Sequence, residues 1–222
     1  MIAHVVAAPV AGRRLAVSGR DPSYVDLDGF VVVVVGRAGP LLPNGVVLTD
    51  RPHKGELSLA GAHVWDPALR LPADPARLGA EILQTLNQPY ERGQTPLLAA
   101  YERGQTPLLA AEAARALIGR GPGLTPEGDD TVAATAAVVA VGPWPAAEKA
   151  AWLSAALGPD LRERTTSLSA TLLELAAEGQ VAEPLQALLA GRRSALARLL
   201  RIGHSTGRAY ALAAARALTA IG

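Results

Sequence analysis

The sequence predicts an α+β protein in which an N-terminal antiparallel β-sandwich or small barrel, residues 1–72, precedes an all-helical layer, residues 73–222. Two observations lead to this fold class. Before residue 72, short β-branched runs alternate with Gly, Pro, Asp and Asn and leave no room for helices. After residue 73, long segments rich in Ala and Leu are bounded by Pro, Ser or Thr at the start and by Gly at the end.

In the N-terminal part, each β-branched run has the length of a strand. Asp28-Gly29 is a typical tight-turn pair and predicts a hairpin. The five consecutive valines 31–35 predict a strand that is covered on both faces. Because no helical segment separates the runs, antiparallel pairing is expected. The predicted strands are His4–Val10, Leu15–Ser18, Tyr24–Leu27, Phe30–Val35, Val46–Thr49 and Glu56–Val64.

The helical part begins at Asp74-Pro75, where a capping residue precedes a proline suited to the first helical turn. The short connections between later segments predict helices that pack nearly antiparallel. The further helices are expected at Pro107–Ile118, Asp129–Val141, Pro145–Leu157, Thr166–Glu178, Pro184–Ala190, Ser194–Ile202 and Ser205–Ile221. An exact repeat, Tyr90–Ala100 followed by Tyr101–Ala111, comes after the first helix. Each copy is expected to start a short helix, at Thr95-Pro96 and at Thr106-Pro107, and the repeat is assigned no function.

Composition narrows the classes of function. The chain has 222 residues, half of them hydrophobic, a net charge of +1 and no cysteine. Its basic residues are scattered, which argues against a nucleic-acid partner, and no apolar run is long enough to span a membrane. The absence of cysteine excludes disulfides and thiolate catalysis and fits a cytoplasmic protein.

The stretch 119–131 contains four glycines, two prolines and two adjacent carboxylates between apolar segments. We interpret it as a loop that leads into a helix, with Thr125 as the cap and Pro126 at the first helical position. The free amides of such a loop form an anion pocket. The candidate substrate-binding residues here are Gly121, Gly123, Thr125 and Gly128.

Asp129 and Asp130 stand in the first turns of the same helix and would repel a bare phosphate. A ligand that presents an ammonium or amide to the carboxylates would resolve this conflict. A Mg²⁺ ion between aspartate and phosphate would also resolve it. Both aspartates are therefore candidate catalytic residues and candidate Mg²⁺ ligands. The alternative is that they only cap loop amides.

A second glycine-flanked junction, residues 203–207, precedes the last helix and contains His204, Ser205 and Thr206. It satisfies the pattern of a nucleophile elbow. However, no strand precedes it and no acid or histidine follows Ser205, so we reject a hydrolase. His204 is the candidate proton donor, and the two hydroxyls are candidate ligand contacts. A plain helix junction is the alternative.

Arg164 precedes four hydroxyl residues at another helix start and is a candidate for binding a carboxylate or phosphate. A solvated arginine beside a helix cap is the simpler interpretation. The other histidines, His4, His53 and His63, lack the spacing of a zinc site. No phosphate-binding or dinucleotide-binding fingerprint is present.

The run Leu117–Asp130, LIGRGPGLTPEGDD, resembles the signature of the AllH-like family, which includes a subunit of oxamate carbamoyltransferase. The likeness extends to residues 164–169, 202–207 and 57–67. Glu127 and the exact repeat depart from the family pattern. The resemblance implies transfer of a carbamoyl group from carbamoyl phosphate to oxamate in purine breakdown, with a small anionic substrate and companion subunits.

Three interpretations remain open at this point. In the first, the chain is an enzyme subunit whose two glycine-rich junctions form two walls of one site. In the second, it is a non-catalytic binding or scaffolding subunit whose glycines allow a partner to dock closely. In the third, both junctions serve only internal helix packing, with the aspartates fully satisfied by loop amides and no cavity nearby.

Overall fold

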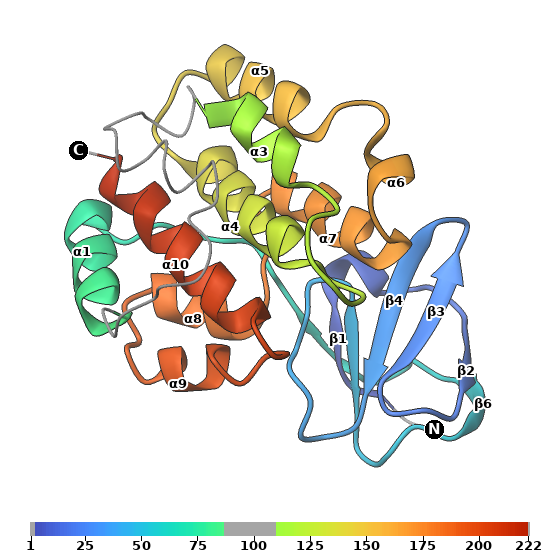
Figure 1. Cartoon of the computed structure of the whole chain (residues 1–222). Helices are drawn as coiled ribbons and strands as arrows, with labels where there is room; N and C mark the ends of the chain where they lie inside the picture. Colours follow the sequence, from blue (N-terminus) through green and yellow to red (C-terminus); the bar gives the residue numbers. More distant parts are fainter. Residues whose placement is uncertain (1–2, 87–109, 222) are drawn as a thin grey trace.

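A computed structural model describes residues 3–86 and 110–221. Figure 1 shows strands gathered on one side of the molecule and helices on the other. The strands are β1 (Ala3–Ala7), β2 (Leu15–Ser18), β3 (Ser23–Leu27), β4 (Phe30–Val35), β5 (Gly45–Leu48), β6 (Lys54–Leu57) and β7 (His63–Trp65), and a short 3₁₀ helix, η1, covers Ala8–Val10.

The N-terminal sheet is mixed, which corrects the prediction of antiparallel pairing. Five strands lie in the order β3-β4-β5-β1-β7, and the β4–β5 and β1–β7 pairs are parallel. The sheet is not closed into a barrel. A separate antiparallel pair, β2–β6, packs its apolar side chains against one face of the larger sheet.

Two local expectations for the strands are confirmed, and two are wrong. The strand predicted at His4–Val10 ends at Ala7, where the 3₁₀ helix η1 follows. Asp28 and Gly29 both have positive φ, 55° and 90°, and close a hairpin between β3 and β4. The valines of β4 are covered on both faces, because Val32 and Val34 belong to one apolar cluster and their neighbours to another. The single strand predicted at Glu56–Val64 is two strands, since a turn at Gly61 separates them.

The helices are α1 (Pro75–Leu86), α3 (Ala111–Leu117), α4 (Glu127–Val141), α5 (Ala146–Leu157), α6 (Leu161–Arg164), α7 (Ser167–Ala177), α8 (Glu183–Leu189), α9 (Ala195–Leu199) and α10 (Thr206–Thr219). Apart from the short α6, each was expected within a few residues. The predicted helix starts at Thr95 and Thr106 lie outside the described residues.

Helix α4 lies at the centre of the helical layer (Figure 1). All but a few of its residues are buried, and its Ala and Val side chains allow α7 and α10 to pack closely on it. Both aspartates of its first turn share this burial. A helix that is apolar on every side belongs in the middle of a layer.

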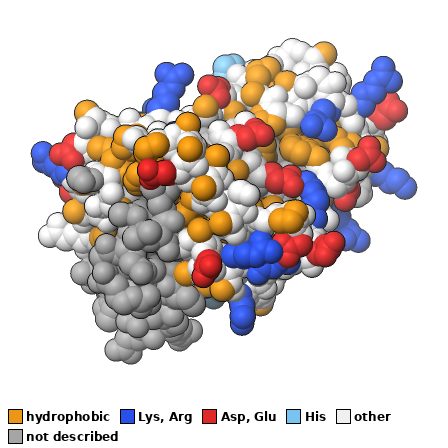
Figure 2. Space-filling model, turned by 90° about the horizontal axis from the view of Figure 1, so that it is seen from above, with side chains coloured by type: hydrophobic (Ala, Val, Ile, Leu, Met, Phe, Trp, Pro, Cys, Tyr) orange, Lys and Arg blue, Asp and Glu red, His pale blue; other side chains and the backbone are white. Residues whose placement is uncertain are grey.

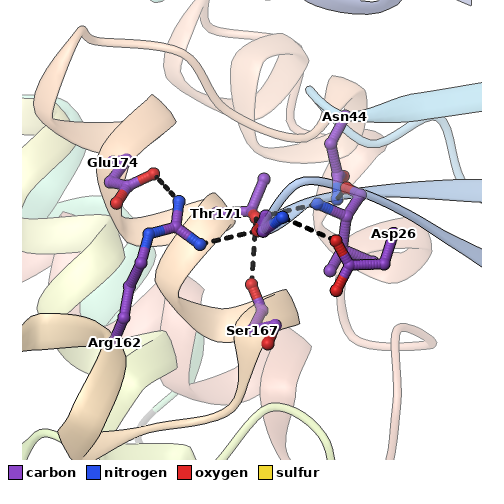
Figure 3. A network of polar contacts seen from close by, with 8 residues as sticks. Asp26, Asn44, Arg162, Ser167, Thr171 and Glu174 are labelled. Atoms are coloured by element: carbon purple, nitrogen blue, oxygen red, sulfur yellow. Dashed lines mark hydrogen bonds and ion pairs between the residues drawn. The ribbon is translucent and has the colours of Figure 1, made fainter.

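Helix α7 joins the helical layer to the sheet. Leu168 and Leu172 pack on one face of the β4 valines. Figure 3 shows polar contacts at the same junction, where the Thr171 hydroxyl accepts a hydrogen bond from the Val31 amide at 3.0 Å and Arg162 Nη1 donates to the Gly29 carbonyl at 2.6 Å. The hairpin is thereby fixed against α7.

Acidic and basic side chains are interspersed on the face seen in Figure 2. No single charge dominates that face. Across the described ranges 3–86 and 110–221, the helices are too short or too polar to cross a bilayer.

Candidate functional site

The loop that joins α3 to α4 has the conformation that its glycines predict. Gly119, Gly121 and Gly123 have φ of 78°, 119° and 96°, a region that other residues rarely adopt. At Gly119 a side chain would also lie 2.2 Å from the Arg164 carbonyl oxygen. The loop therefore lies directly against the segment that precedes α7.

Helix α4 begins at Glu127, one residue after the start that was expected with Thr125 as the cap. Pro126 is the N-cap residue and makes no side-chain cap, whereas Thr125 contacts another helix. Gly128 packs closely on the end of α3, since a Cβ there would lie 2.1 Å from the Leu117 carbonyl oxygen. Its amide donates to the Arg120 carbonyl at 2.9 Å, so Gly128 fixes the loop.

Asp129 has a hydrogen-bond partner for each carboxylate oxygen. Oδ1 accepts from the Gly119 amide at 2.6 Å, and Oδ2 accepts from the Thr165 hydroxyl. The side chain is buried. Asp129 therefore ties three segments together: the loop, the start of α4 and the residues before α7.

Asp130 is equally buried, with 2% of its surface exposed, but its Oδ2 atom has no hydrogen-bond partner. Burial raises the pKa of Asp130 to about 8. A hydrogen bond from Thr206 lowers this pKa, and the charges of Asp129 and Glu127 raise it. The group is consequently protonated for the most part at neutral pH.

The two glycine-rich junctions meet at a pair of hydroxyls. Thr125 Oγ1 lies 3.2 Å from Thr206 Oγ1. Gly207 allows α10 to begin directly against the end of α9, since a Cβ there would lie 1.8 Å from the Leu199 carbonyl oxygen. Gly121–Asp130 and Gly203–Gly207 are thus adjacent, which the interpretation as two walls of one site requires.

The segment before α7 forms hydrogen bonds that hold the glycine-rich loop in place. Thr166 caps α7 by accepting from the Ser169 amide at 3.1 Å and donates to the Leu124 carbonyl at 2.6 Å. Arg164 points towards α3, where its Nη2 donates to the Arg115 carbonyl at 2.6 Å, and its Nη1 is buried without a partner. Binding of a substrate anion by Arg164 stays a prediction.

His204 is exposed and does not line the cavity that lies between the sheet, α7 and α10. Ser205 is the N-cap residue of α10 but makes no side-chain cap. Of the three polar residues predicted in this junction, Thr206 is the one that the structure places next to an aspartate. A role for His204 as proton donor stays a prediction.

A cavity of about 440 Å³ lies between the sheet, α7 and α10. Thr125 and Thr206 contribute hydroxyls to its wall, and Tyr210 contributes a phenol. Burial, followed by the charges of Asp130 and Asp129, raises the pKa of Tyr210 well above its ordinary value. Tyr210 was not predicted, although its place four residues after Thr206 puts both on one helix face.

A metal ion fits this site poorly. Both oxygens of Asp129 are already bonded within the chain. Across residues 3–86 and 110–221, no three His, Asp or Glu side chains come together in a group that could bind a metal ion. Mg²⁺ requires several oxygen ligands, and Asp130 alone offers an unpartnered carboxyl oxygen here.

These features define an α+β protein with a buried carboxyl beside a glycine-rich loop at the start of its central helix. Residues 117–218 match a protein family described as oxamate carbamoyltransferase subunit AllH. The chain therefore carries a domain of the AllH family, as the signature at Leu117–Asp130 indicated. No curated protein and no solved structure matches the chain.

Proposed function

We propose that this chain is a subunit of a carbamoyltransferase that uses carbamoyl phosphate and acts on oxamate or a similar small carboxylate or amide. The matched residues, 117–218, contain the glycine-rich loop, both aspartates and the junction with Thr206. The family description names a subunit, so we propose that companion subunits complete the enzyme.

The observation that carries the proposal is a set of backbone amides that donate no hydrogen bond, close to a protonated carboxyl. Within the part of the chain that the structure describes, the amides of Gly121, Gly123 and Leu124 donate no hydrogen bond. Both carboxylate oxygens of Asp129 accept hydrogen bonds within the chain, and Asp130 is mostly protonated at neutral pH. The repulsion of an anion by Asp130 is therefore largely removed, and the loop amides suit a phosphate or a carboxylate.

Asp130 suits the proton transfer of this reaction. When the amide nitrogen of oxamate attacks the carbamoyl carbon, the new C–N bond replaces the C–O bond to phosphate. The nitrogen loses one proton, and the leaving phosphate gains one. A carboxyl with a pKa of about 8 is matched to an acid–base role near neutral pH. Thr206 would relay the proton between this carboxyl and the substrate.

The experiment measures oxalurate and phosphate formed from carbamoyl phosphate and oxamate by the chain co-purified with its companion subunits. Asp130→Asn removes the titrating group at nearly constant shape and is expected to lower kcat at least a hundredfold. Asp28→Asn, in an exposed turn, is the control and should leave turnover unchanged. Failure of the wild-type complex to form oxalurate would overturn the proposal.

A non-catalytic docking subunit is the second candidate, and one observation favours it. Leu124 is 54% exposed at the end of the glycine-rich loop, where an apolar side chain suits a protein contact. This candidate predicts that Leu124→Asp prevents assembly with companion subunits. It also predicts that Asp130→Asn leaves turnover intact and that the isolated chain binds neither oxamate nor carbamoyl phosphate in calorimetry.

A further inference from the structure

We propose that the cavity between the sheet and α10 binds an uncharged small molecule with an apolar body and one hydrogen-bonding group, such as a primary amide. This ligand differs from the substrates of the carbamoyl transfer proposed above, although the two sites share Thr206. Oxamate and carbamoyl phosphate are small anions, and the amides of the glycine-rich loop suit them. The cavity, by contrast, suits an uncharged and mainly apolar ligand.

The wall of the cavity is mainly apolar. Its side chains come from the sheet, from the segment after β4, from α7 and from α9. The apolar residues in the wall include Val33, Val35, Leu42, Leu168, Leu172 and Leu199. Its volume of about 440 Å³ lies within the range of sites for drug-sized ligands.

The described residues that line the cavity include no Lys, Arg or His. Their only carboxylate is Asp21, whose Oδ1 accepts a hydrogen bond from the Gly36 amide at 3.2 Å. A bound carboxylate or phosphate would lose its water without gaining a cationic partner, which is strongly unfavourable. The cavity therefore selects against charged ligands.

Polar groups converge on one part of this apolar wall. The hydroxyls of Thr125 and Thr206 lie 3.2 Å apart, and Tyr210 lies four residues further along the helix. Behind Thr206 stands the buried Asp130, whose Oδ2 lacks a partner. These groups can donate and accept, which matches an amide.

An unsatisfied acceptor lies in the wall. Gln180 Oε1 is buried without a hydrogen-bond partner, while its Nε2 donates to Glu178 at 3.0 Å. Buried polar atoms without partners are uncommon in native structures and often face an absent water or ligand. Gln180 belongs to the lining of this cavity, whereas Asp130 lies behind Thr206 and outside the lining.

The test titrates the chain with phenylacetamide and hexanamide, each beside phenylacetate and hexanoate as isosteric carboxylates, in two-dimensional NMR. We expect the amides to bind at least tenfold more tightly than the carboxylates. The largest shifts are expected at the amides of Leu172, Gly203 and Thr206.

Ala182→Leu places extra side-chain volume in the cavity and should weaken amide binding at least tenfold. Ala147→Leu, on the exposed face of α5, is the matched control and should bind like the wild type. Thr206→Val, which keeps the side-chain volume, tests the polar contact if Ala182→Leu does not fold, and should weaken the amides more than any residual binding of the carboxylates.

Three results would overturn the proposal. Carboxylates could bind as tightly as the amides, or the shifts could map away from the cavity. In the third case, neither amide would bind at millimolar concentration, which would leave the cavity to a side chain of a partner subunit.

Discussion

The hydroxyl oxygens of Thr125 and Thr206 lie 3.2 Å apart, although 81 residues separate them in the chain. One belongs to the glycine-rich loop and the other to the first turn of α10. Thr206 also donates a hydrogen bond to Asp130. The pair therefore links the buried carboxyl to the wall of the cavity.

Thr206→Val removes this donor while keeping the shape of the side chain. Because the hydrogen bond favours the ionised carboxyl, the pKa of Asp130 should rise above its value of about 8. A ¹³C NMR titration of the Asp130 carboxyl measures it. Thr219→Val removes an exposed hydroxyl from the same helix and should leave this pKa unchanged. An unchanged or lower pKa in Thr206→Val would show that Thr206 does not donate to Asp130.

Gly119→Ala and Gly123→Ala form a matched pair. Both glycines have positive φ, so alanine is strained at each. They differ in space, since a Cβ at Gly119 would meet the Arg164 carbonyl at 2.2 Å, whereas nothing lies within 4 Å at Gly123. Gly119→Ala should lower the free energy of unfolding by about 1–3 kcal/mol more than Gly123→Ala. Equal losses in urea titrations would contradict the close approach of the loop.

Thr165→Val tests the hydrogen bonds that hold Asp129. The change leaves a buried carboxylate oxygen without its donor, which should lower the free energy of unfolding by about 1–3 kcal/mol. Thr85→Val is the control, because the Thr85 hydroxyl is exposed and donates only to the Glu81 carbonyl of its own helix. Chemical denaturation measures both variants. A loss no larger than that of the control would mean that Asp129 does not need Thr165.

Local signals in the sequence predicted local structure well. Asp28-Gly29 closes a hairpin because both residues tolerate positive φ, and Pro75 opens α1 because its ring suits the first turn. The glycines of residues 119–123 likewise indicated a loop. In each case the physical cause lies within a few residues of its effect.

Long-range relationships were not predictable in this way. β4 and β5 pair in parallel, and the alternation of side chains along a strand does not encode the direction of its partner. Thr125 has the composition of a helix cap, but it contacts Thr206 across the fold. The difference between Asp129 and Asp130, which are adjacent in sequence, arises because only Asp129 faces the Gly119 amide and Thr165.

The dependence of the free energy of unfolding on pH should reveal the raised pKa of Asp130. Its pKa is raised from 3.8 in the unfolded chain to about 8 in the folded protein, so between these values the folded state holds a proton that the unfolded state has lost. Raising the pH through this window therefore lowers the free energy of unfolding, by up to about 1.4 kcal/mol per pH unit from this group. Below pH 3.8 and above pH 8 the contribution of Asp130 becomes constant.

Asp130→Asn removes this contribution, because asparagine does not titrate. The variant should gain stability relative to the wild type as the pH rises from about 4 to about 8, and its profile in urea titrations should be flatter over that window. Asp28→Asn removes an exposed carboxylate from a turn position that asparagine also tolerates and should keep the wild-type slope. If Asp130→Asn and the wild type have parallel profiles from pH 4 to pH 8, then Asp130 is ionised in the folded protein. Its assignment as the acid–base group would then fail.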